Sequence, residues 1–544
     1  MIFQKKSKKI TMIALIGLIC LTLFLNLFKK SEVPACLNAD EAAFGYNTYS
    51  ILHTLKDEHG NFLPMRLKSF DDFKMPLYSY LSIPAIAVFG MTDVSIRFLN
   101  VIVAVLLLLS SYVLFKKISG EDKIALLGSF FVVSSVWTLV ITRHAHEVAL
   151  SALFITLASY FAIHFFERKT LKLLIFTLFF ALLGAFSYHI GRIYLIFMVG
   201  AVILSTGRES IKSSQGRIMS LVSIGAFFVP FIFDLRYGAN RLSNLAFYKN
   251  IGFSLRITEY LNEHPIRLIH NKLVEGVIFL TNNYLRQLSP DFLTVAGDVN
   301  QRFGFVEMSP ITPIVLVCAL VGIFALFENK HKYRYFVLGL LLISPLGNAL
   351  TWQPDSLTRT FFLIVPIAFL ASCGFFRLAN GTKNMLANFI GDSLSKFVVP
   401  LLLLIHLFFL LFAYDIYFFH YFKRPTVQSA WQCGNKQMAK YVKKNYNRFD
   451  KFYISTKNGQ PYIYLLFYNN FSPDRFQTEA QRSSRDEFGF TQVRSFDKFV
   501  FKLPSNKDKS KTAYIGFPDE IDQSQVDSKI QFQGKDIFWV KENK

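Results

Sequence analysis

Residues 5–28 read KKSKKITMIALIGLICLTLFLNLF, in which four lysines precede a run of 19 residues, 10–28, that has no charged side chain. A helix of this length crosses the hydrocarbon core of a bilayer, which is about 30 Å thick. The run is long for the core of a signal peptide, and no small-residue cleavage pattern closes it. We therefore interpret it as a retained signal anchor that starts on the cytoplasmic side.

Apolar blocks of this kind recur along the chain. Hydrophobic residues make up 52% of the sequence and charged residues only 18%, whereas about 25% of the residues in soluble domains are charged. We predict a polytopic α-helical membrane protein with about 11 transmembrane helices, at 10–28, 97–115, 124–142, 148–166, 171–190, 192–206, 217–233, 310–327, 335–350, 360–376 and 397–419.

Lysine and arginine are concentrated in alternate short segments between these blocks. With a cytoplasmic N-terminus, the segments on its side contain 19 Lys and Arg against 6 Asp and Glu. Cytoplasmic loops of membrane proteins carry such an excess. The net charge of +22 therefore indicates orientation in a bilayer and not nucleic-acid binding. The sequence predicts a multi-pass plasma-membrane protein whose functional face is extracytoplasmic.

Three extended regions share that outer face. The first is the loop 29–96, and its end, Pro76–Gly90, is apolar but short and contains Pro84, which favours an interfacial helix over a span. The second is the region 234–309. We place both in a transmembrane domain that covers residues 1–419.

The third outer region, 420–544, is polar and long enough to fold as a separate soluble domain. Its pattern predicts a helix over 431–445 and strands over 449–455, 513–517 and 537–540. We expect a small α/β domain.

The five cysteines leave their redox state open. Three lie inside apolar blocks, and none belongs to a C-x-x-C pair. Cys36 and Cys433 are on the same predicted side of the membrane. They either form a disulfide or remain free thiols.

The first outer loop opens with an adjacent acidic pair, Asp40-Glu41. Carboxylates just past a span serve as general bases or cation ligands. The alternative is that Asp40 caps a helix running to Ile51, with Glu41 favouring its positive end. Lys74 precedes the interfacial stretch, so its ammonium group would lie at headgroup depth, either to bind phosphate or merely to reach water.

The segment Arg143-His144-Ala145-His146-Glu147 contains three residues of the types that bind metals, two His and one Glu. It lies in a loop of a few residues, and neighbouring side chains on a helix that starts there point apart. A metal site needs three or four ligands that converge. We therefore predict no metal site here, and a divalent metal is left open but not expected.

Together these segments resemble the GT-C superfamily of membrane glycosyltransferases, and most closely the branch of the protein O-mannosyltransferases and the lipid A aminoarabinose transferase. The resemblance is carried by Asp40-Glu41, by Lys74 with Pro76-Leu77-Tyr78, and by Phe89-Gly90 followed by Arg97. Further likenesses are Asn283-Tyr284, 289–293, Gly297-Asp298 and 355–359. The resemblance to this branch covers roughly residues 10–420.

The resemblance implies a polyprenyl-phosphate sugar as donor and an inverting transfer to a hydroxyl group outside the cytoplasm. Asp40 matches the family's catalytic base, Glu41 its acidic neighbour, and Glu147 a second outer carboxylate. Lys74 matches the juxtamembrane lysine that faces the lipid phosphate. Phe73 stands where the aminoarabinose transferase has an acidic residue, so the contacts to the sugar are expected to differ. Further candidates for substrate binding are Tyr78, Arg97, Arg143, His189, Arg192 and Arg359.

The alternative function is a transporter or polysaccharide-export component with the same topology. Such proteins place ionisable residues near the middle of the membrane, whereas the charged residues here lie at the ends of the predicted spans. The partners expected for the enzyme are the lipid-linked sugar, membrane lipid, and an acceptor that is a protein, a glycolipid or a cell-wall glycan.

Overall fold

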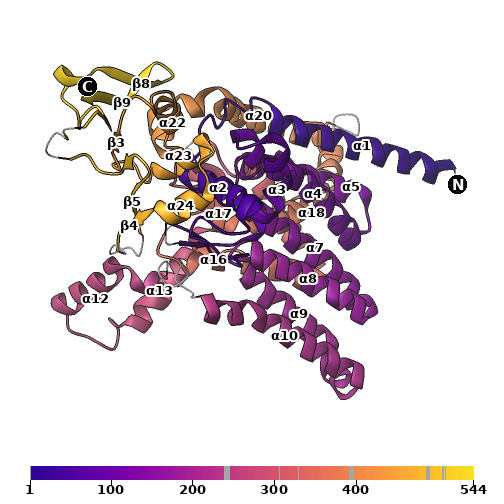
Figure 1. The fold of residues 1–544 in the computed structure, drawn as a ribbon. Helices are drawn as coiled ribbons and strands as arrows, with labels where there is room; N and C mark the ends of the chain where they lie inside the picture. The colour runs from indigo at the N-terminus through magenta and orange to yellow at the C-terminus, as the bar shows by residue number, and fades with distance from the viewer. Residues whose placement is uncertain are drawn as a thin grey trace. The chain divides into compact units, whose positions relative to one another are not determined.

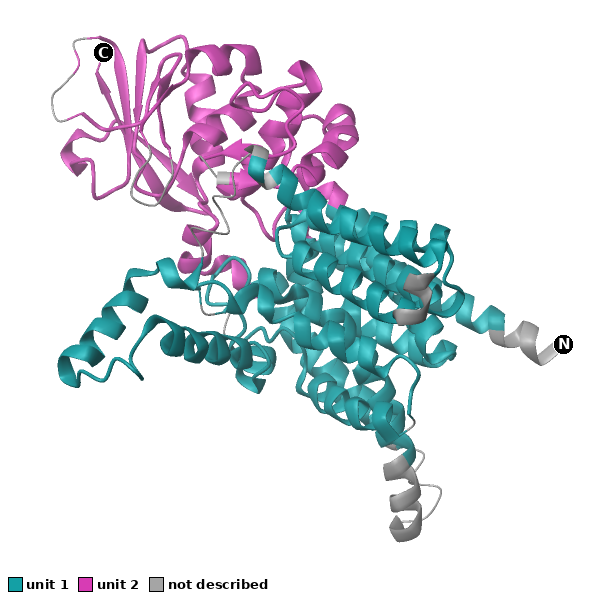
Figure 2. Ribbon diagram, turned by 90° about the horizontal axis from the view of Figure 1, so that it is seen from below, with its two compact units in different colours: residues 1–28, 100–419 teal, residues 29–99, 420–544 magenta. Residues whose placement is uncertain are grey.

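The computed structural model describes residues 2–70, 72–237, 246–304, 307–328, 330–353, 355–390, 397–484, 491–504, 508 and 510–543. The predicted regions 29–96, 234–309 and 420–544 and the cytoplasmic segment 377–396 therefore lie partly outside the described residues. Figure 1 shows the helices and strands in chain order. The chain forms two compact units, which have different colours in Figure 2. Unit 1 contains residues 1–28 and 100–419, and unit 2 contains residues 29–99 and 420–544. The first outer loop thus belongs to the same unit as the C-terminal segment.

The regular elements of unit 1 are helices, as far as its residues are described. Its longer helices are α1 (Ile2–Leu27), most of α4 (Asp93–Ser119), α5 (Asp122–Ser134), α6 (Val136–Thr142), α7 (Glu147–Arg168), α8 (Leu171–Ser187), α9 (Gly191–Lys212), α10 (Ser214–Tyr237), α12 (Ile251–Glu263), α13 (Lys272–Arg286), α14 (Pro313–Glu328), α15 (Arg334–Ile343), α18 (Ile364–Ile390) and α20 (Val398–Asp415). Short turns connect them: η1 (Phe247–Lys249), η2 (Phe292–Ala296), α16 (Leu346–Ala349), α17 (Leu357–Thr360), η3 (Phe361–Leu363) and η4 (Ile416–His420).

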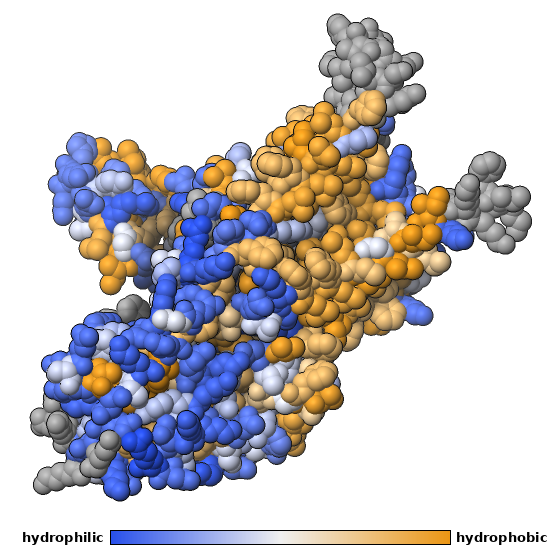
Figure 3. All heavy atoms as spheres, turned by 90° about the horizontal axis from the view of Figure 1, so that it is seen from above, coloured by the Kyte–Doolittle hydropathy of each residue, from blue (hydrophilic) through white to orange (hydrophobic). Residues whose placement is uncertain are grey.

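Helices occupy all eleven of the predicted spans, with two helices in each of the spans 124–142 and 335–350. Six helices of the described chain are long and apolar enough to cross a membrane: 8–27, 93–119, 147–168, 214–233, 357–380 and 399–423. The helices at 171–187, 191–207, 313–328 and 334–349 are apolar but shorter. The chain is a multi-pass membrane protein, and the helices of unit 1 expose many large apolar side chains (Figure 3). The count of eleven spans stays a prediction.

The predicted single span 124–142 is wrong in one respect. Two helices, α5 and α6, meet there at a bend of 57°. Ser135 has extended backbone between them, and its hydroxyl accepts a hydrogen bond from the backbone N–H of Thr138. A serine that caps the second helix in this way ends the first one. The apolar pattern alone contained no sign of this break.

Glycines allow two helices in the core of unit 1 to approach closely. A Cβ atom on Gly322 of α14 would lie 1.9 Å from the carbonyl oxygen of Leu370 in α18. A Cβ atom on Gly374 of α18 would lie 1.8 Å from the carbonyl oxygen of Cys318. Small residues at such crossings are typical of helices packed within a membrane.

The first part of unit 2 is the outer loop. It contains α2 (Ala39–Thr54), a hairpin of β1 (Leu67–Ser69) and β2 (Asp72–Lys74), and α3 (Leu77–Phe89). The predicted short apolar helix before Gly90 is confirmed as α3, whose 13 residues span about 20 Å and cannot cross a bilayer. The first residues of α4 complete this part.

The second part of unit 2 is the small α/β domain that the sequence predicts. Seven strands form a mixed sheet in the order β4 (Gln481–Arg482), β5 (Val493–Phe496), β6 (Phe499–Val500), β3 (Lys451–Ile454), β7 (Thr512–Gly516), β9 (Lys535–Asn543) and β8 (Ser528–Phe532). The central strand β3 is parallel to β6 and β7. The helices are α21 (Pro425–Ala430), α22 (Asn435–Lys444), α23 (Tyr462–Asn469) and α24 (Pro473–Glu479).

Candidate functional site

The acidic pair lies in the first turn of α2, and Asp40 is not the residue that caps this helix. Asn38 is the N-cap: its side chain accepts a hydrogen bond from the N–H of Glu41, and the Glu41 side chain accepts one from the N–H of Asn38. The predicted capping role of Asp40 is therefore wrong, and the helix runs to Thr54, beyond Ile51. The spacing Asn-x-x-Glu is the sequence signal of such a capping box.

Asp40 is paired with Lys74. The Lys74 ammonium donates a hydrogen bond to a carboxylate oxygen of Asp40 at 2.8 Å, although 34 residues separate the two in sequence. The Lys74 side chain is 4% exposed, whereas that of Asp40 is 48% exposed. The hairpin places Lys74 at the end of β2, opposite Leu67. The result is a carboxylate that solvent can reach, held from behind by a buried cation.

Aromatic rings surround the Lys74 ammonium group. Its nitrogen lies 4.9 Å from the ring centroid of Phe44 and 5.3 Å from that of Phe70. Phe44 in turn packs against Tyr78, whose hydroxyl donates to the backbone oxygen of Ile96 at 2.9 Å. Rings favour a cation over their faces and exclude water from it. The predicted binding residue Tyr78 is buried, so it shapes this wall and offers no exposed hydroxyl.

Glu41 points away from Asp40 into a buried ion pair. Arg97 donates to both of its oxygens, at 2.8 and 2.7 Å, and neither side chain is more than 1% exposed. The same guanidinium group donates to the backbone oxygens of Pro34 and Cys36, each at 2.7 Å. A bidentate arginine with four hydrogen bonds fixes geometry strongly. Arg97 thus holds the start of α2 and the chain before it in one arrangement.

Residues of the C-terminal segment also contact α2 and the chain just before it. Cys36 and Cys433 form a disulfide, which settles the alternative that the sequence left open. The side-chain oxygen of Gln432 accepts hydrogen bonds from the N–H of Ala39 at 2.9 Å and from the hydroxyl of Tyr464 at 2.8 Å. A Cβ atom on Gly45 would lie 2.3 Å from the Phe467 ring, so only glycine lets α2 approach α23 this closely. No local sequence pattern indicates these contacts.

Removing the disulfide should destabilise unit 2. The Cys36→Ser/Cys433→Ser variant should lose about 2–5 kcal/mol of stability, because the bond closes a long loop of chain. Thermal unfolding in detergent, with and without reductant, measures this. Reductant should lower the melting temperature of the wild type and leave the double variant unchanged. Cys20→Ser, which alters an exposed thiol in the first span, is the control. An equal response of wild type and double variant to reductant would contradict the prediction.

Glu147, the third predicted carboxylate, begins helix α7 in unit 1. His146 is the N-cap of this helix, and its ring nitrogen accepts a hydrogen bond from the N–H of Val148 at 3.1 Å. That nitrogen lies 3.5 Å from a carboxylate oxygen of Glu147. Asn100 donates to the backbone oxygens of His144 and His146, which fixes the loop. Glu147 is 4% exposed, so this carboxylate lies within the protein.

Arg143 is fully buried. Its guanidinium group donates to the backbone oxygen of Leu25 at 2.6 Å and lies 4.9 Å from the ring centroid of Phe418. These contacts connect α6 to the end of the first span and to the turn after α20. They favour a structural role for Arg143, which the sequence analysis treated as a binding residue.

His189 and Arg192 flank the start of α9. Both are at most 9% exposed. A Cβ atom on Gly191, between them, would lie 2.3 Å from the carbonyl oxygen of Gly184 in α8. Glycine at position 191 therefore allows α8 and α9 to pack closely, and this packing fixes the positions of His189 and Arg192.

Arg359 belongs to a polar group that unites two segments quoted in the sequence analysis. Asp298 accepts hydrogen bonds from the N–H groups of Leu357 and Asn300, each at 2.8 Å. Arg359 donates to the side-chain oxygens of Asn348 and Thr351, each at 3.4 Å. The segment before α17 is further held by an ion pair of 2.7 Å between Asp355 and Arg286. Asp298 was not among the predicted site residues, although its place beside Gly297 was noted.

Burial raises the pKa of the Asp298 carboxyl to about 6, against the opposing effects of its two backbone N–H donors and of Arg359. The folded protein thus holds this proton more tightly than the unfolded chain, in which the pKa is near 3.8. The stabilisation is complete below about pH 4 and is lost as the pH rises through 6.

The melting temperature of the wild type should therefore fall between about pH 4 and pH 6 relative to that of Asp298→Asn, whose amide does not titrate. Thermal unfolding across this pH range measures the difference. Asp291→Asn, a change at an exposed carboxyl, should follow the wild type. Parallel curves for the wild type and Asp298→Asn would contradict the raised pKa.

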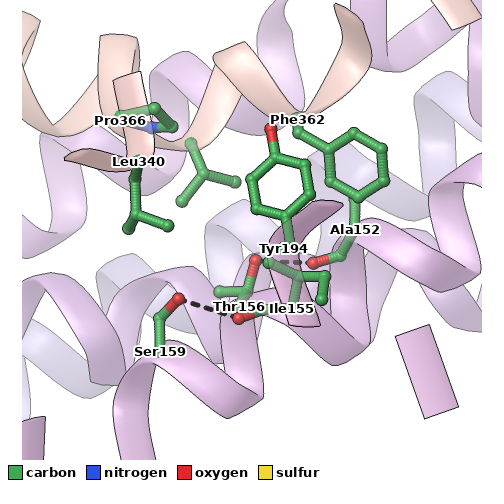
Figure 4. A pocket seen from close by; sticks show the side chains of 9 residues that line it. Ala152, Ile155, Thr156, Ser159, Tyr194, Leu340, Phe362 and Pro366 are labelled. Carbon is green, nitrogen blue, oxygen red and sulfur yellow. Dashed lines mark hydrogen bonds between the residues drawn. The ribbon is translucent and has the colours of Figure 1, made fainter. Parts of the chain in front are cut away.

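A small cavity inside unit 1 is a poor candidate for a ligand site. It is lined by Ala152, Ile155, Thr156, Ser159, Tyr194, Leu340, Phe362, Val365 and Pro366 (Figure 4). The Thr156 and Ser159 hydroxyls donate to the backbone oxygens of Ala152 and Ile155, and that of Tyr194 donates to Ser344. No hydroxyl of the cavity therefore requires a ligand. Among the described residues, no group of three His, Cys, Asp or Glu side chains is arranged to hold a metal ion.

Comparison with known proteins gives a fold but no sequence relative. No protein-family model matches the chain, and no curated protein matches it by sequence. ArnT from Cupriavidus metallidurans in the apo state matches 99% of this chain and 98% of its own, with a TM-score of 0.53 and 9% identity. The same enzyme bound to undecaprenyl phosphate matches 98% of each chain, with a TM-score of 0.50 and 9% identity.

The oligosaccharyltransferase of Archaeoglobus fulgidus, tethered to an acceptor peptide, is a weaker match. It has 13% identity and a TM-score of 0.47 over 84% of this chain, which spans 62% of the length of that enzyme. The fold rests on ArnT, which is matched over nearly its whole length. The chain shares the fold of ArnT, which is the fold that the resemblance in its sequence predicts.

Proposed function

We propose that the protein is an integral-membrane glycosyltransferase that moves a sugar from a polyprenyl phosphate to an acceptor hydroxyl on the extracytoplasmic side. The observation that carries the proposal is the half-exposed Asp40 carboxylate, which is held by the buried Lys74 ammonium. Asp40 lies twelve residues after Phe28, the last residue of the first apolar run. The shared fold supports it, because ArnT has been seen bound to undecaprenyl phosphate.

In the proposed reaction Asp40 is the general base. The acceptor oxygen attacks the anomeric carbon as its proton passes to the Asp40 carboxylate. The bond between the anomeric carbon and the phosphate oxygen breaks on the opposite face, so the configuration inverts. The leaving group departs as polyprenyl phosphate and keeps the bonding electrons. No nucleotide sugar and no oxidant takes part.

The leaving phosphate gains negative charge, which fixed cations stabilise in a site with little water. Lys74 supplies such a cation, and its ion pair with Asp40 leaves it oriented before the donor binds. Arg192 and Arg359 are the further candidates for phosphate contacts, and Glu147 is the second candidate carboxylate. Glu41 with Arg97 positions the base and does not touch the substrate. The acceptor is a protein, a glycolipid or a cell-wall glycan.

Donor binding should depend on Lys74. Lys74→Ala and Arg192→Ala should each weaken binding of polyprenyl phosphate by about tenfold to a hundredfold, since a charge-assisted contact contributes about 1.5–3 kcal/mol. Titration of the purified protein with a short-chain polyprenyl phosphate measures this. Lys68→Ala, on the neighbouring strand β1, is the matched control. Unchanged affinity in both variants would make Lys74 and Arg192 ordinary interfacial cations.

The function itself is tested with purified protein, a labelled sugar and an acceptor extract. Label should enter the acceptor when it is supplied as a polyprenyl-phosphate sugar, and not when it is supplied as the nucleotide sugar. Transfer from the nucleotide sugar alone, or no transfer from any lipid-linked hexose or pentose, would overturn the proposal.

A further inference from the structure

The region between α10 and α14 contains a helical hairpin, which we call the arm: η1, α12 and α13, residues 247–286. It extends from the helices of unit 1 (Figure 2). Three aromatic rings hold the hairpin together: Phe247 packs on Phe253 and Phe279 with ring centroids 5.4 and 5.3 Å apart. Glu275 of α13 pairs with Arg256 of α12 at 3.2 Å. These three phenylalanine rings and this ion pair thus lie between the two helices of the arm.

A second, aliphatic face of the arm is exposed. On α13 the exposed positions recur at helical spacing, with Leu273 at 74%, Val277 at 57% and Leu285 at 58%. The start of α12 and the turn before α13 also expose large aliphatic side chains, namely Ile251, Leu255, Ile266, Leu268 and Ile269. Soluble surfaces rarely gather so many large aliphatic side chains, and such patches mark contact with a partner or a membrane.

Both ends of the arm are fixed to the same end of the helix bundle. At the first end, the N–H of Phe247 donates to the backbone oxygen of Leu350 at 3.3 Å. At the second, Asn283 donates to the backbone oxygen of Thr351 at 3.2 Å, and the Tyr284 hydroxyl donates to that of Leu342 at 2.6 Å. Leu350 and Thr351 directly follow the apolar segment 334–349, and Leu342 is the residue before the last one of α15. The arm therefore starts and finishes where an apolar segment of unit 1 ends.

Positive charge borders the aliphatic face. Lys249, Arg267 and Lys272 are exposed, and the last two stand next to the exposed residues Leu268 and Leu273. Lysine and arginine beside an aliphatic stripe are typical of helices that lie in the headgroup region and attract anionic lipids. Protein-binding surfaces instead concentrate aromatic residues in their centres, and the Phe side chains of this arm are turned inward.

We propose that the arm lies in the bilayer interface, with the aliphatic side of α13 sunk into the boundary between headgroups and acyl chains. The bilayer, and not a protein partner, covers the exposed residues. Arg286 at the end of the arm pairs with Asp355. An arm anchored in the interface would therefore hold the segment around Asp355 and Arg359 at the depth of the lipid headgroups. This assignment does not depend on the proposed transfer reaction.

The test uses an environment-sensitive fluorophore on single cysteines in the full chain. Cys20, Cys318 and Cys373 are replaced by serine, and the disulfide cysteines are kept. One label is placed at Leu273→Cys and the matched control at Asn282→Cys, which is nine residues away and thus half a turn around the helix. Both positions are exposed, so neither change disturbs packing.

The proteins are reconstituted in vesicles of phosphatidylcholine and phosphatidylglycerol in equal amounts. The label at Leu273→Cys should show blue-shifted emission and be quenched by a spin label near the lipid headgroups, whereas the label at Asn282→Cys should be quenched by iodide. Iodide quenching at both positions would overturn the proposal. Blue-shifted emission at Leu273→Cys without quenching by the lipid would overturn it too, and would indicate a protein partner.

Discussion

Asp40→Asn should fold, bind the donor and lose about 10²–10⁴-fold in turnover, because it removes the proton acceptor from the reaction. The amide keeps the size of the side chain, and its oxygen still accepts a hydrogen bond from Lys74. The substitution does not remove a helix cap, since Asn38 and not Asp40 caps α2. Asp40 is half-exposed but Lys74 is buried, so the variant leaves the Lys74 ammonium without its counterion, and its stability has to be measured beside its turnover.

The measurement is the initial rate at saturating donor, together with a binding titration and a melting curve for the same preparation. Glu32→Gln is the matched control, because it neutralises an exposed carboxylate in the same loop. Wild-type turnover in a well-folded Asp40→Asn protein would remove Asp40 from the role of base. Glu147 would then be the carboxylate to test.

Arg97→Met should be the most destabilising single change in unit 2. It leaves Glu41 buried without its counterion and deprives the oxygens of Pro34 and Cys36 of their donor. Breaking a buried ion pair by removing one partner costs about 3–5 kcal/mol. The expected result is a much lower melting temperature and low yield. The melting temperature of Arg97→Lys should lie between those of the wild type and Arg97→Met, since lysine keeps the charge but not the bidentate geometry.

Arg377→Met provides the control, since its ion pair with Glu328 is more than half exposed and should matter by less than about 1 kcal/mol. The double variant Arg97→Met/Glu41→Leu, which leaves no buried charge, should recover part of the lost stability. A melting temperature of Arg97→Met equal to that of Arg377→Met would show that the ion pair does not hold the start of α2.

The membrane helices could be predicted because the bilayer imposes a local rule. A span must be a continuous apolar helix, so α4, α7 and α18 are visible in any hydropathy pattern. The strands β3, β7 and β9 were found for a similar reason, since they are rich in β-branched and aromatic side chains. The bend at Ser135 could not be predicted, because one hydrogen-bonding serine in an apolar run carries no periodic signal.

The candidate site was only partly predictable. Asp40 and Lys74 were singled out separately, but their pairing depends on the hairpin β1–β2, which brings together residues far apart in sequence. The hydrogen bond from the N–H of Ala39 to the side chain of Gln432 joins residues that are 393 positions apart in the sequence. Such contacts leave no local pattern. The capping box of Asn38 and Glu41 is the opposite case: its spacing was present in the sequence and could have excluded Asp40 as the cap.

The most direct test of the proposed reaction follows both halves of a lipid-linked sugar in proteoliposomes of the purified protein. The account predicts that one polyprenyl phosphate is released for each sugar that appears on an acceptor hydroxyl, with the opposite anomeric configuration. Asp40→Asn should release neither in the same time. Intact lipid-linked sugar that crosses the bilayer without release of polyprenyl phosphate would contradict the account and would identify the protein as a transporter.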